Sequence, residues 1–115
     1  MTDQVRAAHL LIKHTGSRNP VSRRTGQQVS LSPQEAMQEL TGYMNKIQQE
    51  GLGSFPHYAK ERSDCGSFRQ NGDLGCFGRG MMQESFEKAA FALNVGEMSG
   101  IVSSDSGYHL IYRIA

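Results

Sequence analysis

Four side chains of this sequence have the chemistry of a reactive or hydrogen-bonding site. Cys65 lies in a glycine-rich stretch, SDCGSFRQNGDLGCFGRG, that is too irregular for a helix interior. His9 and His109 lie in alternating apolar segments near the two ends of the chain, and Ser106 lies in a turn-forming SDSG segment. A histidine beside Cys65 could activate the thiol as a nucleophile, as in thiol proteases and thiol-redox enzymes. The simpler alternative for a buried histidine is a neutral ring that holds one or two hydrogen bonds.

The two cysteines and two histidines also have the ligand types of a zinc site. Cys65 and Cys76 with His9 and His109 would supply four ligands of the required chemistry. Their spacing lacks the close Cys–Cys or His–His pairs that are typical of zinc sites. We therefore expect no metal at these residues.

Large apolar side chains follow the thiol along the chain. Leu74, Met82 and Phe86 could wall a small apolar cup beside Cys65. From Met82 onward the sequence becomes helical, because apolar residues recur at every third or fourth position. These side chains could equally be ordinary core, since most apolar stripes are core. The residues alone leave both interpretations open.

A long segment without periodicity, residues 14–30, carries Arg18, Arg23 and Arg24 and directly follows Lys13. Loops of this length are uncommon in compact domains unless they are functional or disordered. Guanidinium groups match phosphate oxygens, so the segment is a candidate anion-binding loop. The alternative is a solvated loop whose arginines only keep it soluble.

Strands at both ends of the chain are expected to position the two histidines. Residues 4–13 alternate with both faces mostly apolar, which is typical of a central strand that is covered on both sides. Residues 100–103 and 108–114 are two further extended runs, and Ser104–Gly107 has the chemistry of a hairpin connection. In the last strand His109 shares a face with Ile111 and Arg113.

Helices are predicted between these strands. Ser32 and Glu35 form a capping box, with Pro33 at the first helical position, and Gly51 is the expected end of this helix. Its apolar stripe comprises Ala36 or Met37, Leu40, Met44 and Ile47. A shorter helix is expected over 54–62, burying Phe55, Tyr58 and Ala59. The fold class is therefore α+β, with a small, mostly antiparallel sheet packed by three to four helices.

Length and composition limit the possible function classes. A chain of 115 residues with 37% hydrophobic and 20% charged residues is expected to form one globular domain. The net charge of +1 disfavours a general nucleic-acid-binding protein. No apolar run approaches the ~20 residues of a membrane span, and the polar N-terminus predicts no signal peptide. The two cysteines are expected to be free thiols in a reducing compartment.

Three blocks of the sequence resemble the parvulin family of peptidyl-prolyl isomerases, most closely its phosphate-directed Pin/Ess branch. They are VRAAHLLIKH, SDCGS…NGDLGCFGRGMM…FEKAAFAL and GEMSGIVSSDSGYHLIYRI. The resemblance extends from Val5 to Ile114. It implies the parvulin fold, a four-stranded, mostly antiparallel sheet wrapped by three to four helices, with a short strand near 74–77. It also implies an enzyme that isomerises X-Pro bonds without any cofactor.

The resemblance assigns the candidate residues to roles. The polar catalytic cluster would comprise His9, Cys65, Ser106 and His109. The proline pocket would comprise Leu74, Met82 and Phe86.

The basic loop, about 13–30, is the expected phosphate-binding segment. Lys13 and Arg18 match the branch, but its expected Arg-Arg pair reads Arg18-Asn19. Arg23 and Arg24 follow and are predicted to compensate. The WW module that is common in this branch is expected to be absent, so that the whole chain, 1–115, is one isomerase domain.

The sequence thus predicts a peptidyl-prolyl isomerase that prefers phospho-Ser/Thr-Pro and stabilises a twisted amide without covalent chemistry. Two alternatives share the fold: a phospho-Ser/Thr-Pro binding module with little turnover, and a parvulin without a phosphate requirement. A third is a thiol-redox role for Cys65 and Cys76. The expected partners are proline-containing peptides and proteins, without nucleic acid or membrane. We expect a monomer in the cytoplasm, the nucleus or both.

Overall fold

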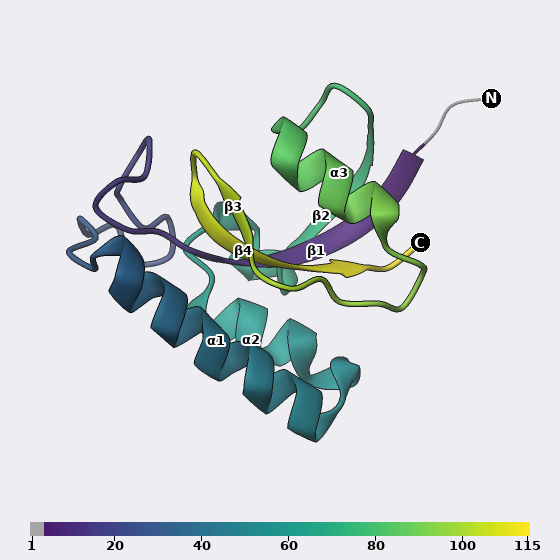
Figure 1. Ribbon diagram of the computed structural model, residues 1–115, viewed down its shortest axis with the longest axis horizontal. Coiled ribbons are helices and arrows are strands. Elements are labelled where there is room, and N and C mark those ends of the chain that lie inside the picture. The colour runs from purple at the N-terminus through teal and green to yellow at the C-terminus, as the bar shows by residue number, and fades with distance from the viewer. Residues whose placement is uncertain (1–3) are drawn as a thin grey trace.

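A four-stranded antiparallel sheet forms the centre of the computed structural model, which describes residues 4–115 (Figure 1). The strands are β1 (Gln4–Ile12), β2 (Asp73–Gly78), β3 (Val102–Ser104) and β4 (Gly107–Arg113). Their order is β2-β1-β4-β3, so the first strand is central, as the sequence predicts. The short strand expected near 74–77 is β2, an edge strand.

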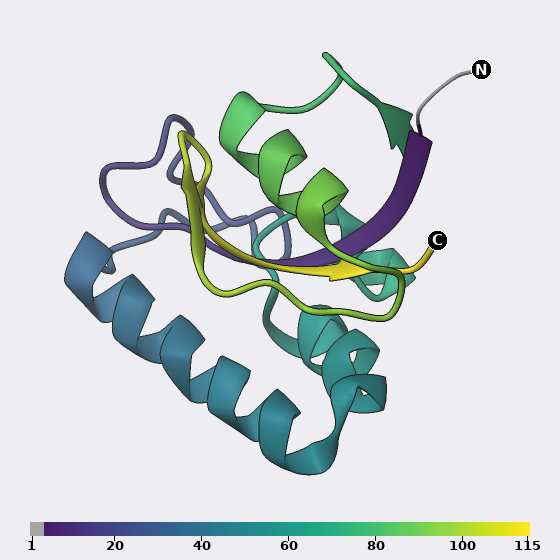
Figure 2. The ribbon, with the colours of Figure 1, turned by 45° about the vertical axis from the view of Figure 1, so that its right-hand side comes forward.

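Helices cover both faces of the sheet. The helices are α1 (Pro33–Glu50), α2 (Phe55–Arg62) and α3 (Glu84–Ala92), with short 3-10 helices at η1 (Leu52–Ser54) and η2 (Gly66–Gln70). Figures 1 and 2 show α1 and α2 together on one face and α3 alone on the other. None of the helices in residues 4–115 is both long and apolar enough to cross a bilayer.

The alternation of β1 divides the core into two clusters. Leu10 and Ile12 pack with α1 and α2 on one face, whereas Val5 and Ala7 pack with α3 on the other. This is the arrangement expected for a strand with two apolar faces. His9 lies on the α3 face, and so does His109 of β4, where Phe86 contacts both rings.

The predicted capping box begins α1. Ser32 Oγ accepts from the Glu35 backbone N–H at 3.1 Å, and Glu35 Oε1 accepts from the Ser32 N–H at 3.0 Å. The helix ends at Gly51, whose φ of 100° favours glycine. Of the two alternatives for the stripe, Ala36 is buried and Met37 is exposed.

Two predicted boundaries are wrong by a few residues. The hairpin turn contains only Asp105 and Ser106, because Ser104 pairs with Gly107 and already belongs to β3. Helix α3 begins at Glu84, after an extended Gln83, although the apolar spacing suggested a start at Met82. Met82 packs against the same cluster from outside the helix.

Candidate functional site

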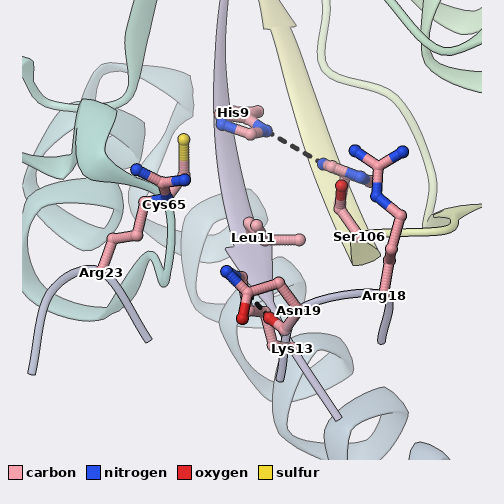
Figure 3. Close-up of a pocket in the computed structure, with 9 residues that line it drawn as sticks. His9, Leu11, Lys13, Arg18, Asn19, Arg23, Cys65 and Ser106 are labelled. Atoms are coloured by element: carbon pink, nitrogen blue, oxygen red, sulfur yellow. Dashed lines mark hydrogen bonds between the residues drawn. The ribbon is translucent and has the colours of Figure 1, made fainter. Parts of the chain in front are cut away.

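A cavity of about 180 Å³ opens beside the two histidines (Figure 3). Its lining residues are His9, Leu11, Lys13, Arg18, Asn19, Arg23, Cys65, Ser106 and His109. All four members of the predicted catalytic cluster and three of the four predicted phosphate ligands therefore lie around one cavity. The sequence places these residues up to 100 positions apart.

Backbone pairing brings Cys65 to the histidines. Asp64 N–H donates to the Leu11 carbonyl at 2.7 Å, and Leu11 N–H donates to Ser63 Oγ at 3.0 Å. Residues 63–65 therefore run beside the end of β1, on the side away from β4. His109 lies on the other side of β1, in β4, where it pairs with Leu11.

The two imidazoles form a buried pair. His9 Nδ1 and His109 Nδ1 are 2.9 Å apart, and His109 Nε2 lies 2.6 Å from Ser104 Oγ. Burial, followed by the charge of His9, lowers the pKa of His109 well below its usual value. His109 is therefore a neutral ring that shares its two nitrogens between His9 and Ser104. The structure supports the hydrogen-bonding interpretation of the histidines over that of metal ligands.

The Cys65 thiol is unusually acidic. Its partial burial raises the pKa, but hydrogen bonding and charge at His9 and hydrogen bonding at Ser67 outweigh burial and lower the pKa to about 6. His9 Nε2, the ring nitrogen not used by His109, is buried and makes no short hydrogen bond within residues 4–115, so His9 acts on the thiol from a longer distance. Figure 3 shows Cys65 on that side of the ring. At neutral pH the cavity wall therefore carries a thiolate.

Ser106 lines the cavity, but the serine that hydrogen-bonds to His109 is Ser104. Ser106 Oγ accepts from Gln83 Nε2 at 3.0 Å, and Ser104 takes the place beside His109. Sequence reasoning missed Ser104 because it assigned this residue to the turn. A two-residue turn would have placed it in the strand, on the His109 side of the sheet, since side chains alternate with a period of two.

The three predicted proline-pocket residues belong to the apolar cluster beside the histidines. Phe86 is buried, and its ring meets those of His9 and His109 edge-on, with centroids 5.4 and 5.1 Å apart. Leu74 and Met82 are half-buried against the same cluster. None of the three lines the 180 Å³ cavity itself, which lies on the basic-loop side of the histidines. Their role as a proline pocket stays a prediction.

Lys13 organises the basic loop from within. Its side chain is only 5% exposed, and Nζ donates to the carbonyls of Asn19 at 2.9 Å and Val21 at 2.8 Å. Burial, followed by the nearby charge of Arg23, lowers its pKa. Two of its three ammonium protons therefore hold the loop in shape.

The loop arginines differ in position. Arg18 and Arg23 enter the cavity from opposite sides (Figure 3), and neither side chain has a hydrogen-bond or ion-pair partner in residues 4–115. Arg24, which the sequence also suggested as a phosphate ligand, instead lines a separate recess with Thr25 and Arg62. The structure thus brings Arg23, and not Arg24, to the cavity.

Two backbone hydrogen bonds attach the loop to the cavity walls. Arg18 N–H donates to the Asp105 carbonyl at 2.8 Å, and Arg23 N–H donates to the Asp64 carbonyl at 2.9 Å. The buried Asp64 carboxylate adds hydrogen bonds from Lys13 N–H at 2.9 Å and Ser22 Oγ at 2.7 Å. The unpaired guanidiniums are therefore presented by an anchored backbone.

The zinc alternative finds no support in the geometry. Cys76 is exposed on the edge strand β2, where it is the β-sheet partner of Arg6 in β1. Within residues 4–115 no three His, Cys, Asp or Glu side chains are grouped closely enough to hold a metal ion.

Comparison with known proteins gives consistent matches over nearly the whole chain. The family model described as "Rotamase: PPIC-type PPIASE domain" matches residues 9–115. A Theileria annulata protein named peptidyl-prolyl cis-trans isomerase NIMA-interacting 1 is 50% identical over 98% of this chain and 81% of its own length. Arabidopsis thaliana peptidyl-prolyl cis-trans isomerase Pin1 is 44% identical over 98% of this chain and 97% of its own. Saccharomyces cerevisiae peptidyl-prolyl cis-trans isomerase ESS1 is 50% identical over 96% of this chain, which spans 65% of that protein.

Solved structures agree with these matches. The peptidyl-prolyl isomerase ESS1 from Candida albicans superposes with a TM-score of 0.93 at 39% identity, covering 100% of this chain and 66% of that one. The solution structure of TbPIN1 superposes with a TM-score of 0.88 at 48% identity and covers both chains completely.

Proposed function

The chain belongs to the PPIC-type parvulin family and is a peptidyl-prolyl cis-trans isomerase, and we propose that it prefers X-Pro bonds preceded by phosphoserine or phosphothreonine. The expected parvulin fold and isomerase activity are thereby confirmed. The observation that carries the proposed preference is a pair of guanidiniums, Arg18 and Arg23, over a cavity that also contains Cys65 and both histidines; within residues 4–115 neither guanidinium has a hydrogen-bond or ion-pair partner.

The charge of the cavity favours an anion. Lys13, Arg18 and Arg23 contribute three cations against the single negative charge of Cys65, and no Asp or Glu is among the nine lining residues. A phosphate ester carries close to two negative charges at neutral pH and accepts several charge-assisted hydrogen bonds. A single carboxylate, as in Glu-Pro, would use this site less fully.

Asn19 changes how the anion would be held. It occupies the position of the second arginine of the branch, and its side chain also lines the cavity. An amide donates a hydrogen bond but carries no charge. In this chain Arg23, on the opposite side from Arg18, supplies the second guanidinium in its place.

The isomerisation requires no bond to be made or broken. The barrier of ~18–20 kcal/mol comes from amide resonance, which places negative charge on the carbonyl oxygen of the planar bond. A negative Cys65 thiolate near that oxygen would disfavour the planar form more than the twisted form, in which resonance is lost. Cys65 acts electrostatically in this scheme and is neither nucleophile nor redox group.

The neighbouring residues hold the substrate and the thiolate. The proline ring would pack on the cluster of Leu74, Met82 and Phe86 while the phosphate binds the basic loop, so that the peptide bond between them is free to rotate. His9, held by its bond to His109, lowers the pKa of the Cys65 thiol. No proton is transferred.

A protease-coupled isomerisation assay with phospho-Ser-Pro, Glu-Pro and Ala-Pro peptides tests the preference. We expect kcat/KM to fall in that order, with phospho-Ser-Pro roughly 10- to 100-fold above Ala-Pro, since hydrogen bonds to charged groups contribute about 1.5–3 kcal/mol. Equal values for the three peptides would instead identify a parvulin without a phosphate requirement. Tight phosphopeptide binding with negligible turnover would identify a binding module.

We propose cytoplasm or nucleus as the compartment, and a monomer as the working state. Both cysteines are free thiols in the structure, which suits a reducing compartment. Fractionation of cells that express a tagged chain tests the compartment, and sedimentation at micromolar concentration tests the oligomeric state.

A further inference from the structure

We propose that Gln83 is a positioning residue that ties the start of α3 to the β3–β4 turn and, through this turn, sets the position of Arg18. The side chain of Gln83 uses both ends of its amide on the turn. Its Nε2 donates to Ser106 Oγ at 3.0 Å, and its Oε1 accepts from the Asp105 backbone N–H at 2.9 Å. Gln83 thus holds both residues of the two-residue turn.

The position of Gln83 before α3 does not by itself explain these bonds. It is the residue that precedes the helix, where short polar side chains commonly cap the first backbone N–H groups, but its side chain makes no capping bond. The amide is directed to the hairpin instead. A side chain that only started the helix would have no need of the turn.

The same turn holds the basic loop. The Asp105 N–H donates to Gln83 Oε1, and the Asp105 carbonyl accepts from the Arg18 N–H at 2.8 Å. Gln83 and Arg18 are therefore linked through one residue of a tight turn. Ser106, the other turn residue, lines the cavity that Arg18 enters.

The second attachment of the loop is independent of Gln83. Arg23 is held by the Asp64 carbonyl at 2.9 Å, on the Cys65 side of the cavity. This separation provides an internal control, because loss of the Gln83 bonds should loosen Arg18 and leave Arg23 in place.

The link has a consequence for substrate selection, and this part of the inference rests on the proposed function. Gln83 lies between Met82 and α3, which carries Phe86, so it borders the proposed proline pocket. If one element positions both the ring-binding cluster and Arg18, an anion bound at Arg18 should strengthen binding of the proline ring. A bound proline ring should likewise strengthen binding of the anion, because coupling between two sites is reciprocal.

Amide hydrogen exchange measured by NMR on Gln83→Met tests the link directly. Methionine has a similar length but cannot make either polar bond. We expect exchange of the Arg18 amide to accelerate roughly tenfold, as for the loss of about one hydrogen bond, while the Arg23 amide keeps its protection. Ser85→Ala, at an exposed position in the first turn of α3, is the matched control and should change neither amide. Unchanged protection of Arg18 in Gln83→Met would overturn the proposal.

Kinetics provide the second readout. We expect Gln83→Met to lower kcat/KM for phospho-Ser-Pro several-fold more than for Ala-Pro. In an enzyme that already carries Arg18→Ala, Gln83→Met should not change the ratio of these two kcat/KM values any further. Equal losses for both peptides would overturn the coupling and leave Gln83 a local stabiliser of α3. A wild-type enzyme without phosphopeptide preference would refute the proposed function, whereas the exchange experiment would still decide the link between Gln83 and Arg18.

Discussion

The acidity of Cys65 gives the enzyme a pH dependence that depends on one side chain. Because the thiol pKa is lowered to about 6, the thiolate is present above this pH and is lost as the pH falls through it. We expect kcat/KM for an uncharged Ala-Pro peptide to fall with an inflection near pH 6. An uncharged substrate is required because a phosphate ester also titrates near ~6.

Two variants separate the charge of Cys65 from its other properties. Cys65→Asp should keep activity and move the inflection toward pH ~4, because a carboxylate stays ionised at lower pH. Cys65→Ala should lose most activity, and its profile should have no inflection near 6. The rate of thiol alkylation, measured over the same pH range, should titrate with the wild-type activity. An aspartate variant as inactive as the alanine variant would contradict the electrostatic role.

Ser104 and Ser106 have different roles, and their alanine variants should show it. Ser104→Ala leaves Nε2 of the buried His109 without its partner, which costs about 1–3 kcal/mol of the free energy of unfolding. Ser104→Thr keeps the hydroxyl and should restore most of the stability. Ser106→Ala loses only the half-buried bond to Gln83 and should cost less, about 0.5–1.5 kcal/mol.

Urea unfolding of these three variants, together with the His109 ring resonances, provides the measurement. The resonances should shift in Ser104→Ala and stay in place in Ser106→Ala. The reverse pattern would show that Ser106, and not Ser104, supports the histidine pair.

At the scale of the elements, the basic loop separates two adjacent arginines. Arg23 enters the cavity and Arg24 lies in another recess, so removal of each takes one positive charge from almost the same place in the sequence. Arg23→Ala should lower kcat/KM for phospho-Ser-Pro roughly tenfold and leave Ala-Pro nearly unchanged. Arg24→Ala should have little effect on either peptide. Equal effects of the two variants on the phosphopeptide would mean that only the general charge of the loop matters.

Gly72 is required where η2 meets β1. Its φ is 83°, and a methyl group there would collide with the His9 carbonyl and lie 2.9 Å from Ala59 Cβ. Gly72→Ala should therefore destabilise the fold by roughly 2–4 kcal/mol, from the left-handed backbone and the overpacking together. Gly42→Ala, in the exposed middle of α1 with open space around it, should stabilise by about 0.5–1 kcal/mol. Urea unfolding of both variants measures the two changes in the free energy of unfolding, which should have opposite signs.

The elements with strong local patterns could be predicted from the sequence, and those formed by distant contacts could not. The capping box at Ser32 and the two apolar faces of β1 are each visible within a few residues, and both are confirmed. The path of the basic loop depends on Arg18 reaching Asp105 and Arg23 reaching Asp64, which no local pattern reveals. The irregular stretch around Leu74 became a strand only because β1 offers it a partner.

The same distinction applies to the site. Residue types and the parvulin resemblance identified His9, Cys65 and His109, which the structure brings together. They did not identify Gln83, because a glutamine next to a helix has no distinctive local signal. Its bonds to the turn, 22 and 23 positions away, exist only after α3 has packed on the sheet.

At the scale of the whole molecule, the net charge is only +1, yet the cavity gathers three cations without a lining carboxylate. Attraction of a phosphopeptide should therefore arise locally and be screened by salt, since the Debye length falls from ~30 Å at 0.01 M to ~10 Å at 0.1 M. We expect KM for phospho-Ser-Pro to rise several-fold over this range. KM for Ala-Pro should stay constant, because this peptide carries no phosphate charge for the cavity to attract. Arg23→Ala should show a smaller salt dependence for the phosphopeptide than Arg24→Ala, although both variants have the same net charge. If both lost the dependence equally, the overall charge of the molecule, and not the placement of its arginines, would control the encounter.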